Sequence, residues 1–598
     1  MSDVAETNAA DTLGPLPEWD LTDLYAGTEA PEIDKDLAEA RTLAGELRQR
    51  CAGKLATLAG DTLGRALGDY EAVDEILSKL MSYAQLVYAA DMADPRSGRF
   101  YQRMQEAVSE ISAELIFFTL ELNEIEEAAL EEKLQDPLLA RYRPWIRDSR
   151  AYRPHQLDER LERLLHDKQV AGASAWTRLF DETMAGLRFR LDGKDQTSME
   201  VLNRMSDFDR AARQRAGEAF AAGLKSRLGL FSLVTNTLAK DKQIEDSWRG
   251  FARPISARNL HNRVEDEVVD ALVGAAVESY PRLSHRYYAM KARWLGLDKL
   301  SYWDRNAPLP TSVDRQVPWD EAQRTVLTAY ADFSEELAGV GRRFFERPWI
   351  DAPARPGKQS GAFAHSTVPS VHPYLLLNYQ GRVRDVMTLA HELGHGVHQV
   401  LASAQGHLLA GTPLTLAETA SVFGEMLTFR RLLADTKDPA ERKAMLASKV
   451  EDMLNTVVRQ IAFHRFETAV HDRRRQGELL SDDLAEIWME TQVEALGPAF
   501  DLNEDYRVFW TYIPHFLHTP FYVYAYAFGD CLVNSLYAVY QEAEEGFAEK
   551  YLELLRAGGT KRHKELLAPF GLDASDPAFW RKGLTVVEGM IDELERLD

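Results

Sequence analysis

The chain has 598 residues, of which 45% are hydrophobic, and a formal net charge of −24 at pH 7. This length allows several domains with buried cores, and the acidic balance argues against a nucleic-acid partner, because phosphate binding needs a basic face. Two cysteines, Cys51 and Cys531, form no disulfide framework and indicate a reducing cytoplasm. The sequence shows neither a secretory signal nor an uncharged apolar run long enough to span a membrane, so we expect a cytoplasmic protein.

From the amino terminus onwards the sequence is dominated by helical periodicity. Residues 1–16 are polar and alanine-rich, and we expect a disordered tail there. A turn at 193–197 closes a helical amino-terminal lobe, 17–200, before a second domain, 201–598. Runs with strand character are few, so the sequence predicts a mainly α-helical fold with one small β-sheet. The long helical stretches are 62–90, 97–135, 265–294, 319–346 and 438–473.

A short apolar run with β propensity, 374–379, lies between Pro373 and Gly381 and predicts a strand. Such a strand can present an edge on which an extended peptide lies by β-augmentation. It can equally be an ordinary buried strand, and the sequence leaves both interpretations open.

The segment His-Glu-Leu-Gly-His begins at His391 and carries the clearest chemistry in the chain. On a helix His391 and His395 share one face about 6 Å apart along the axis, so both imidazoles can bind one zinc ion. Glu392, about 100° further round the helix, is placed to take a proton from water as a general base. Gly394 and Gly396 each cost about 1 kcal/mol relative to alanine, which suggests that another backbone packs closely there.

Glu418, 23 residues after His395, is the candidate third ligand. Glycines and a proline between them are enough to end one helix and start an antiparallel one. The alternative is a capping box that Glu418 forms with Thr415. Glu425, seven residues later on the same face, is either a hydrogen-bond partner for a ligand histidine or a surface glutamate. His398 lies too far along the helix axis from the first histidine to share its zinc, and we expect it to pack.

Aromatic residues cluster between 521 and 528. Such clusters are most often part of a core. A tyrosine hydroxyl near zinc can nevertheless stabilise an oxyanion, where one donor contributes about 3 kcal/mol. The sequence alone does not decide between a packing role and a catalytic one.

Further segments are distributed over nearly the whole chain: 18–25, 302–309, 357–363, 372–378, 459–467 and 513–526. Together with the His-Glu-Leu-Gly-His motif, they resemble the thimet oligopeptidase and oligoendopeptidase F metallopeptidases, and more closely the oligoendopeptidase F branch. The resemblance implies a two-lobed, multi-helical zinc peptidase with a small β-sheet near the active site. It also implies that the parts enclose a substrate channel, which admits short unfolded peptides.

By this resemblance, residues 201–598 are the zinc peptidase catalytic domain. It implies one zinc ion per chain, held by His391, His395 and Glu418, with Glu392 as the general base. His515 and Tyr526 match residues that hydrogen-bond the substrate carbonyl and the developing oxyanion. The remaining positions are a supporting carboxylate at Glu425 and substrate contacts at Tyr522, Tyr524, Gly361, Ala362 and Phe363.

We therefore predict a zinc-dependent oligoendopeptidase that hydrolyses internal bonds of short peptides. One alternative is a dipeptidyl carboxypeptidase, which needs a positive group for a free carboxy terminus; Arg382, Arg384 and Arg507 are available for it. The other is a zinc-stabilised peptide-binding protein without catalysis, which leaves Glu392 without a purpose. The sequence does not indicate an oligomeric state.

Overall fold

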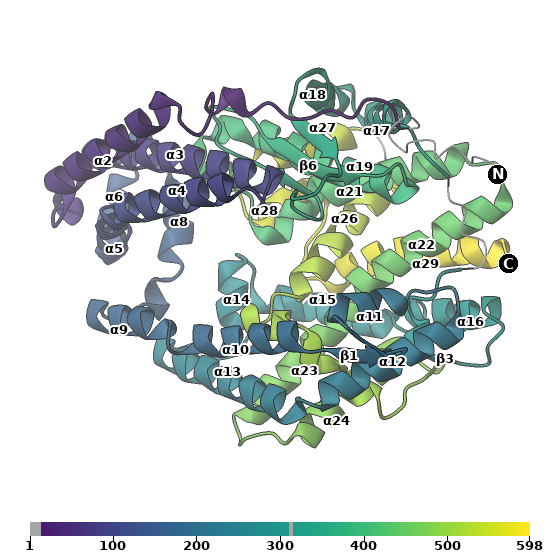
Figure 1. Ribbon diagram of the computed structural model, residues 1–598. Helices are drawn as coiled ribbons and strands as arrows, with labels where there is room; N and C mark the ends of the chain where they lie inside the picture. Colours follow the sequence, from purple (N-terminus) through teal and green to yellow (C-terminus); the bar gives the residue numbers. More distant parts are fainter. Residues whose placement is uncertain (1–12, 310–314, 544) are drawn as a thin grey trace. The chain divides into compact units, whose positions relative to one another are not determined.

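A computed structural model describes residues 13–309, 315–543 and 545–598. Helices make up 70% of it, with only small sheets, so the predicted mainly α-helical fold is confirmed (Figure 1). Of the predicted tail 1–16, residues 1–12 lie outside the described part. Within the described residues no helix combines the length and the apolar character needed to cross a bilayer.

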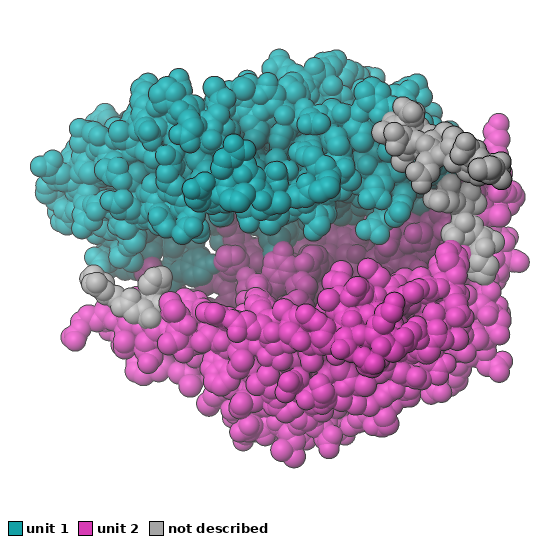
Figure 2. All heavy atoms as spheres, in the orientation of Figure 1, with its two compact units in different colours: residues 1–153, 314–435, 543–570 teal, residues 154–313, 436–542, 571–598 magenta. Residues whose placement is uncertain are grey.

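The chain forms two compact units, which Figure 2 shows in different colours. Unit 1 comprises residues 1–153, 314–435 and 543–570, and unit 2 comprises 154–313, 436–542 and 571–598. Each unit therefore draws on three separate stretches of chain. Neither coincides with the predicted segments 17–200 and 201–598, and their assignment as lobe and catalytic domain stays a prediction.

Unit 1 combines the amino-terminal helices with the three-stranded sheet and the helices that follow it. Its main elements are α2 (Pro31–Cys51), α3 (Gly60–Ala90), α4 (Pro95–Ala113), α5 (Ile116–Glu124), α6 (Glu127–Lys133), α7 (Pro137–Ala140), α8 (Arg143–Arg150), α17 (Trp319–Phe333), α18 (Glu335–Glu346), β4 (Ile350–Pro353), β5 (Phe363–His365), β6 (Tyr374–Tyr379), α19 (Val383–Ala402), α20 (His407–Ala410), α21 (Leu414–Asp435), α27 (Phe547–Arg556) and α28 (His563–Leu567).

Unit 2 is also helical, with two two-stranded sheets. Its main elements are α9 (Glu159–Gln169), α10 (Ala173–Gly186), β1 (Phe189–Leu191), β2 (Lys194–Gln196), α11 (Ser198–Arg204), α12 (Arg210–Lys225), α13 (Leu228–Arg249), α14 (Ser256–His261), α15 (Asp266–Ser279), α16 (Ser284–Trp294), β3 (Leu300–Ser301), η4 (Tyr302–Asp304), α22 (Pro439–Thr456), α23 (Val458–Arg474), α24 (Ser481–Leu496), β7 (Phe500–Asp501), η6 (Tyr506–Tyr512), α25 (His515–His518), α26 (Tyr524–Glu542) and α29 (Pro577–Arg596).

Most of the predicted helical stretches are present but broken into shorter helices. Residues 62–90 fall in one helix, α3. The stretch 319–346 breaks at Ser334, whose side chain accepts a hydrogen bond from the first turn of α18. The helix α15 ends just before Pro281, which cannot donate a backbone hydrogen bond to a continuing helix. Apolar periodicity therefore located helical segments better than it located their ends.

The sheet in unit 1 has the strand order β4-β6-β5, with β6 parallel to β4 and antiparallel to β5. The predicted strand 374–379 is β6, and its bounds are confirmed. Of the two interpretations left open by the sequence, the structure agrees with the buried strand and not with the edge, because strands pair with β6 on both sides. The outer strands of this sheet are β4 and β5, and β5 contains Phe363. The side chain of Asn378 in β6 donates to the carbonyl of Gly361 at 2.8 Å and so holds the turn before β5.

Helices α19 and α21 pack backbone to backbone. A Cβ atom built on Gly394 would lie 2.5 Å from the carbonyl oxygen of Ala420 and 2.6 Å from the Cα of Ser421. The predicted close approach is therefore present at Gly394. At Gly396 the neighbour is instead a side chain, because a Cβ there would lie 2.7 Å from the ring of Phe344.

In unit 2, the loop between η6 and α26 rests on an aromatic core. Phe516 packs against Phe466 of α23 with ring centroids 5.1 Å apart, and Phe466 packs against Trp488 of α24 at 5.4 Å. These contacts fix the short helix α25, which begins at His515.

We expect Gly394→Ala to destabilise unit 1, because the added methyl group meets backbone atoms that can move only if the two helices separate. Overpacking of this kind costs about 1–3 kcal/mol or more. Thermal melting of the purified variant measures the loss. The matched control is Gly339→Ala in α18, where a Cβ meets nothing within 4 Å. Helix propensity makes that control neutral or slightly stabilising. Equal melting temperatures for the two variants would contradict the close crossing.

Candidate metal centre and active site

Three predicted ligand side chains converge in unit 1. His391 and His395 come from α19 and Glu418 from α21, and one donor atom of each lies within 4.8 Å of the other two. The Oε2 atom of Glu418 is 3.4 Å from Nε2 of His391 and 3.5 Å from Nε2 of His395. This group is the only metal-type cluster found in the described part of the chain.

The spacing of these atoms fits a small tetrahedral cation. A tetrahedron with metal–ligand bonds of about 2.0–2.1 Å has edges of roughly 3.3–3.4 Å, close to the separations observed. Two imidazole nitrogens and one carboxylate oxygen are also a donor set typical of catalytic zinc, with a fourth position left for water or substrate. The side chains of this cluster therefore fit zinc in both chemistry and spacing.

Glu418 is held by its own helix. Its Oε2 accepts a hydrogen bond from the hydroxyl of Ser421 at 2.7 Å. Helix α21 begins at Leu414, so Thr415 lies inside the first turn and not at the capping position before it. The ligand interpretation of Glu418 therefore agrees with the geometry, and the capping box does not.

Two neighbours of the cluster behave differently. Glu425 lies about two helical turns beyond Glu418. Its Oε2 is 3.2 Å from Nδ1 of His391, so it can orient that ring. Although burial lowers the pKa of His391, the hydrogen bond to Glu425 and the charge of Glu418 raise it to about 9. His398 is buried, and burial lowers its pKa to about 4, as expected for a packed neutral histidine.

Glu392 is buried on α19 beside the cluster. Burial raises the pKa of its carboxyl group to about 7, while the charge of His391 and a hydrogen bond from the backbone amide of Ala364 lower it. Ala364 is in the middle of β5, so the edge strand and the glutamate are in direct contact. The predicted substrate-contact segment, Gly361, Ala362 and Phe363, runs into this same strand.

In unit 2, His515 and Tyr526 come together across the loop that joins α25 to α26. The Tyr526 hydroxyl lies 3.4 Å from Nε2 of His515, and the Tyr526 side chain is exposed. Tyr522 packs near both, with ring centroids 6.2 Å from His515 and 5.3 Å from Tyr526. Three of the four predicted aromatic and imidazole groups thus form one cluster.

Tyr524 is the exception. Its side chain is fully buried, and its hydroxyl accepts a hydrogen bond from the amide of Asn262 at 2.8 Å. A role in supporting the loop fits this position better than the predicted contact with substrate. Arg258, in the helix α14 that ends just before Asn262, donates to the carbonyl of Pro520 at 3.2 Å and also holds the loop.

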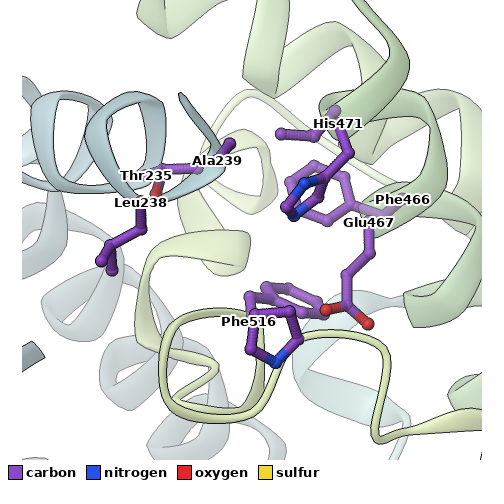
Figure 3. Close-up of a pocket in the computed structure, with 9 residues that line it drawn as sticks. Thr235, Leu238, Ala239, Phe466, Glu467, His471 and Phe516 are labelled. Carbon is purple, nitrogen blue, oxygen red and sulfur yellow. The ribbon is translucent and has the colours of Figure 1, made fainter. Parts of the chain in front are cut away.

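Glu467 of α23 holds the opposite side of this loop. Its Oε1 accepts a hydrogen bond from the backbone N–H of Phe521 at 2.9 Å. Phe521 has a φ of +60°, a left-handed conformation that is costly for a bulky residue and needs such support. Figure 3 shows Glu467 and His471, which come from one helix, lining a small cavity of about 20 Å³. Burial raises the pKa of Glu467 to about 8, against the lowering effect of the Phe521 amide.

Several supporting contacts join residues that lie far apart in the sequence. Tyr330 donates to the carbonyl of Ala390 at 2.7 Å, across 60 residues, and Glu467 acts on Phe521 across 54. Such pairs are visible only once the fold brings them together. Ser421, three residues after Glu418 on a predicted helix, is the one neighbour that helical spacing could have identified.

Comparison with known proteins finds matches over most of the chain. A family model described as "Peptidase family M3" matches residues 203–586, and one described as "Oligopeptidase F" matches residues 121–189. The chain is 27% identical to "Oligopeptidase PepF" of Bacillus subtilis, over 100% of this chain and 88% of that protein. It is 26% identical to an "Oligoendopeptidase F homolog" of Lactococcus lactis, over 97% of each.

Among solved structures, the chain resembles a putative peptidase from Chlamydophila abortus with a TM-score of 0.86 and 23% identity, over 97% of this chain and 98% of that one. It also resembles an oligoendopeptidase-F from Enterococcus faecium with a TM-score of 0.70 and 22% identity, over 95% and 98%. These structures support the fold.

We expect Glu467→Gln to remove a pH-dependent loss of stability. Below about pH 4.5 the carboxyl group is neutral in the folded and the unfolded chain. Between about 4.5 and about 8 only the unfolded chain releases the proton, so wild-type stability falls as pH rises through this window. The variant should gain on the order of 4 kcal/mol relative to wild type from pH 4.5 to 8, since one pKa unit corresponds to about 1.4 kcal/mol.

Urea unfolding of wild type and variant at both pH values measures this difference. Glu486→Gln, at an exposed position of α24, is the control and should show no such trend. A wild-type-to-variant difference that stays constant with pH would argue against a buried, protonated Glu467.

Proposed function

We propose that this chain, which belongs to peptidase family M3 and is a metalloendopeptidase, hydrolyses internal bonds of short peptides with one zinc ion as its cofactor. The match to the family model spans residues 203–586 and so covers more than half of the chain. The observation that carries the proposal is the convergence of two imidazole nitrogens and one carboxylate oxygen at tetrahedral spacing beside a buried glutamate.

In this proposal His391, His395 and Glu418 hold the zinc. Glu425 keeps the ring of His391 in position through Nδ1, so that Nε2 is free to bind metal. When bound, zinc supplies a Lewis acid that polarises the substrate carbonyl and lowers the pKa of a water molecule.

Glu392 is the proposed general base. Its carboxylate takes a proton from the attacking water and then delivers it to the nitrogen of the leaving amine. A base of this kind works best when its pKa lies near the working pH, and burial shifts the Glu392 carboxyl group in that direction. The amide of Ala364 fixes the orientation of the carboxylate.

The substrate contacts are proposed on two elements. Within the described residues no strand pairs with the outer edge of β5, so an extended peptide can add to it by backbone hydrogen bonds at Gly361, Ala362 and Phe363. His515 and Tyr526 are the proposed donors to the substrate carbonyl and the oxyanion, where one donor contributes about 3 kcal/mol. Tyr522 packs beside them as a further substrate contact.

Of the two alternatives, the non-enzymatic protein does not agree with membership of a peptidase family. A dipeptidyl carboxypeptidase would use the same metal and the same base, but the family and the named relatives favour an endopeptidase. Of the three arginines available for the carboxypeptidase, Arg507 is already paired with Glu504 at 3.3 Å. The cytoplasmic location rests on the two cysteines, both of which are buried and free.

A short peptide blocked at both ends distinguishes the two activities. We expect internal cleavage by mass spectrometry, its complete loss with a metal chelator, and recovery when zinc is added back. An exopeptidase needs a free terminus and leaves this peptide intact. Trimming of the unblocked peptide alone would therefore move the assignment to the carboxypeptidase.

We expect Glu392→Gln to retain one zinc per chain and to lose activity by about 10²–10⁴-fold, because the amide binds no proton from water. Metal analysis and kcat on a quenched fluorescent peptide measure the two effects separately. Glu335→Gln, at an exposed position of α18, is the control and should keep full activity. Turnover within tenfold of wild type in Glu392→Gln would exclude this glutamate as the base.

A further inference from the structure

Two arginines in unit 2 have no carboxylate partner among the residues that the structure describes. Arg459, the second residue of α23, donates weakly from Nη2 to the hydroxyl of Tyr512 at 3.4 Å and lies over the ring of Phe463 at 4.9 Å. Its Nε is buried and makes no hydrogen bond to any described residue. The side chain of Arg305, which follows η4, makes a 3.4 Å contact with Asn306 and no other hydrogen bond in the described part of the chain. Neither guanidinium forms an ion pair within the described part of the chain.

The two guanidinium groups share one environment. Burial and then the charge of Arg305 lower the pKa of Arg459, and the charges of Tyr288, Tyr506 and Tyr512 act to raise the pKa of both guanidinium groups. A third cation, Lys291, donates to the backbone carbonyl of Arg305 at 2.6 Å. Glu451, whose charge also acts on Arg305, forms an ion pair with Lys291. The cluster therefore has a surplus of positive charge.

The carboxylate next to Arg305 in sequence does not relieve this surplus. Asp304 is fully buried and is bonded to Arg210 and Arg213, each with an N–O distance of 2.9 Å. An unpaired, partly buried guanidinium is costly in a protein, because its N–H donors lose water without gaining acceptors. In a chain with 94 acidic and 70 basic residues, such a pair is not explained by a shortage of carboxylates.

The cluster adjoins the proposed substrate contacts of unit 2. Burial and then the charge of Arg459 lower the pKa of His515. Tyr512, which accepts the weak bond from Arg459, ends the helix η6 three residues before His515. A group that binds between these side chains would lie next to the residue proposed to contact the substrate carbonyl.

We propose that Arg459, with Arg305 beside it, binds a carboxylate of the peptide substrate and so selects peptides with a negative charge near the cleaved bond. This inference rests on the proposed function, because it assigns the ligand to the same substrate. Arginine suits the role, since its planar fork binds a carboxylate through two parallel hydrogen bonds. The carboxylate is either the carboxy terminus of the peptide or the side chain of an aspartate or glutamate.

Peptide binding to the Glu392→Gln protein tests the inference without depending on turnover. The probes are acetylated peptides of one sequence, compared in pairs. The first pair has a free or an amidated carboxy terminus. In each further pair the terminus is amidated, and one position carries either glutamate or glutamine; this position is moved along the peptide from pair to pair. Isothermal titration calorimetry gives a Kd for each pair. We expect one carboxylate form to bind about 10–100-fold more tightly than its neutral partner, the range of a charged hydrogen bond.

Adding Arg459→Gln should reduce this ratio to about twofold or less, with little change in affinity for the neutral peptide. Arg305→Gln should reduce it in the same direction by a smaller amount, and serves if the first variant does not fold. Arg473→Gln is the matched control, because Arg473 is exposed on the same helix and should leave the ratio unchanged.

The possible outcomes distinguish the two sources of the carboxylate, and they distinguish failure of this inference from failure of the proposed function. A ratio confined to the free-terminus pair identifies the terminal carboxylate, and one confined to a glutamate pair identifies a side chain. Equal binding of charged and neutral peptides overturns the inference and leaves the proposed function standing. Equal weakening of the charged and the neutral peptide by Arg459→Gln also overturns the inference, because it indicates a purely structural role for Arg459. Failure to bind any form contradicts the inference and the proposed function together.

Discussion

The candidate metal centre depends on one close contact, the crossing of α19 and α21 at Gly394. Only with backbone against backbone can Glu418 on one helix come within 3.5 Å of both histidines on the other. Gly424 leaves room for Tyr330, because a Cβ at this position would lie 2.2 Å from the tyrosine hydroxyl. This hydroxyl donates a hydrogen bond to the carbonyl of Ala390. The glycines that weaken these helices intrinsically are therefore what allows them to assemble the site.

Both units use a buried glutamate to hold functional backbone in place. In unit 1, Glu392 meets the amide of Ala364 in the edge strand β5, and in unit 2 Glu467 meets the amide of Phe521 in the loop before α26. Burial raises the pKa of both carboxyl groups, because a buried carboxylate loses its hydration. The consequence of burial differs between the two glutamates. In Glu392 it brings the pKa of the proposed base towards the working pH, whereas in Glu467 it accompanies a hydrogen bond that supports the strained backbone of Phe521.

The sequence was sufficient for features that depend on local spacing. Two histidines four residues apart define a shared helix face, and the apolar run 374–379 gave the bounds of β6. It was insufficient wherever the partner is distant. The neighbours of β6 decide that it is a central strand, but β5 is only three residues long and has no alternating pattern of its own. The two units, each built from three separate stretches of chain, could not be predicted for the same reason, because periodicity describes one segment at a time. His515 and Tyr526 came from resemblance, not from spacing.

Charge illustrates the gap between composition and local environment. A net charge of −24 excludes broad classes of partner, yet it does not describe any one site. Asp304 is bonded to Arg210 and Arg213 and not to its sequence neighbour Arg305, and the buried Nε of Arg459 has no acceptor among the described residues. Folding alone would favour pairing such groups, because each unpaired donor costs about 1–3 kcal/mol. Cations that stay unpaired among so many carboxylates are therefore better explained by a ligand that brings its own negative charge.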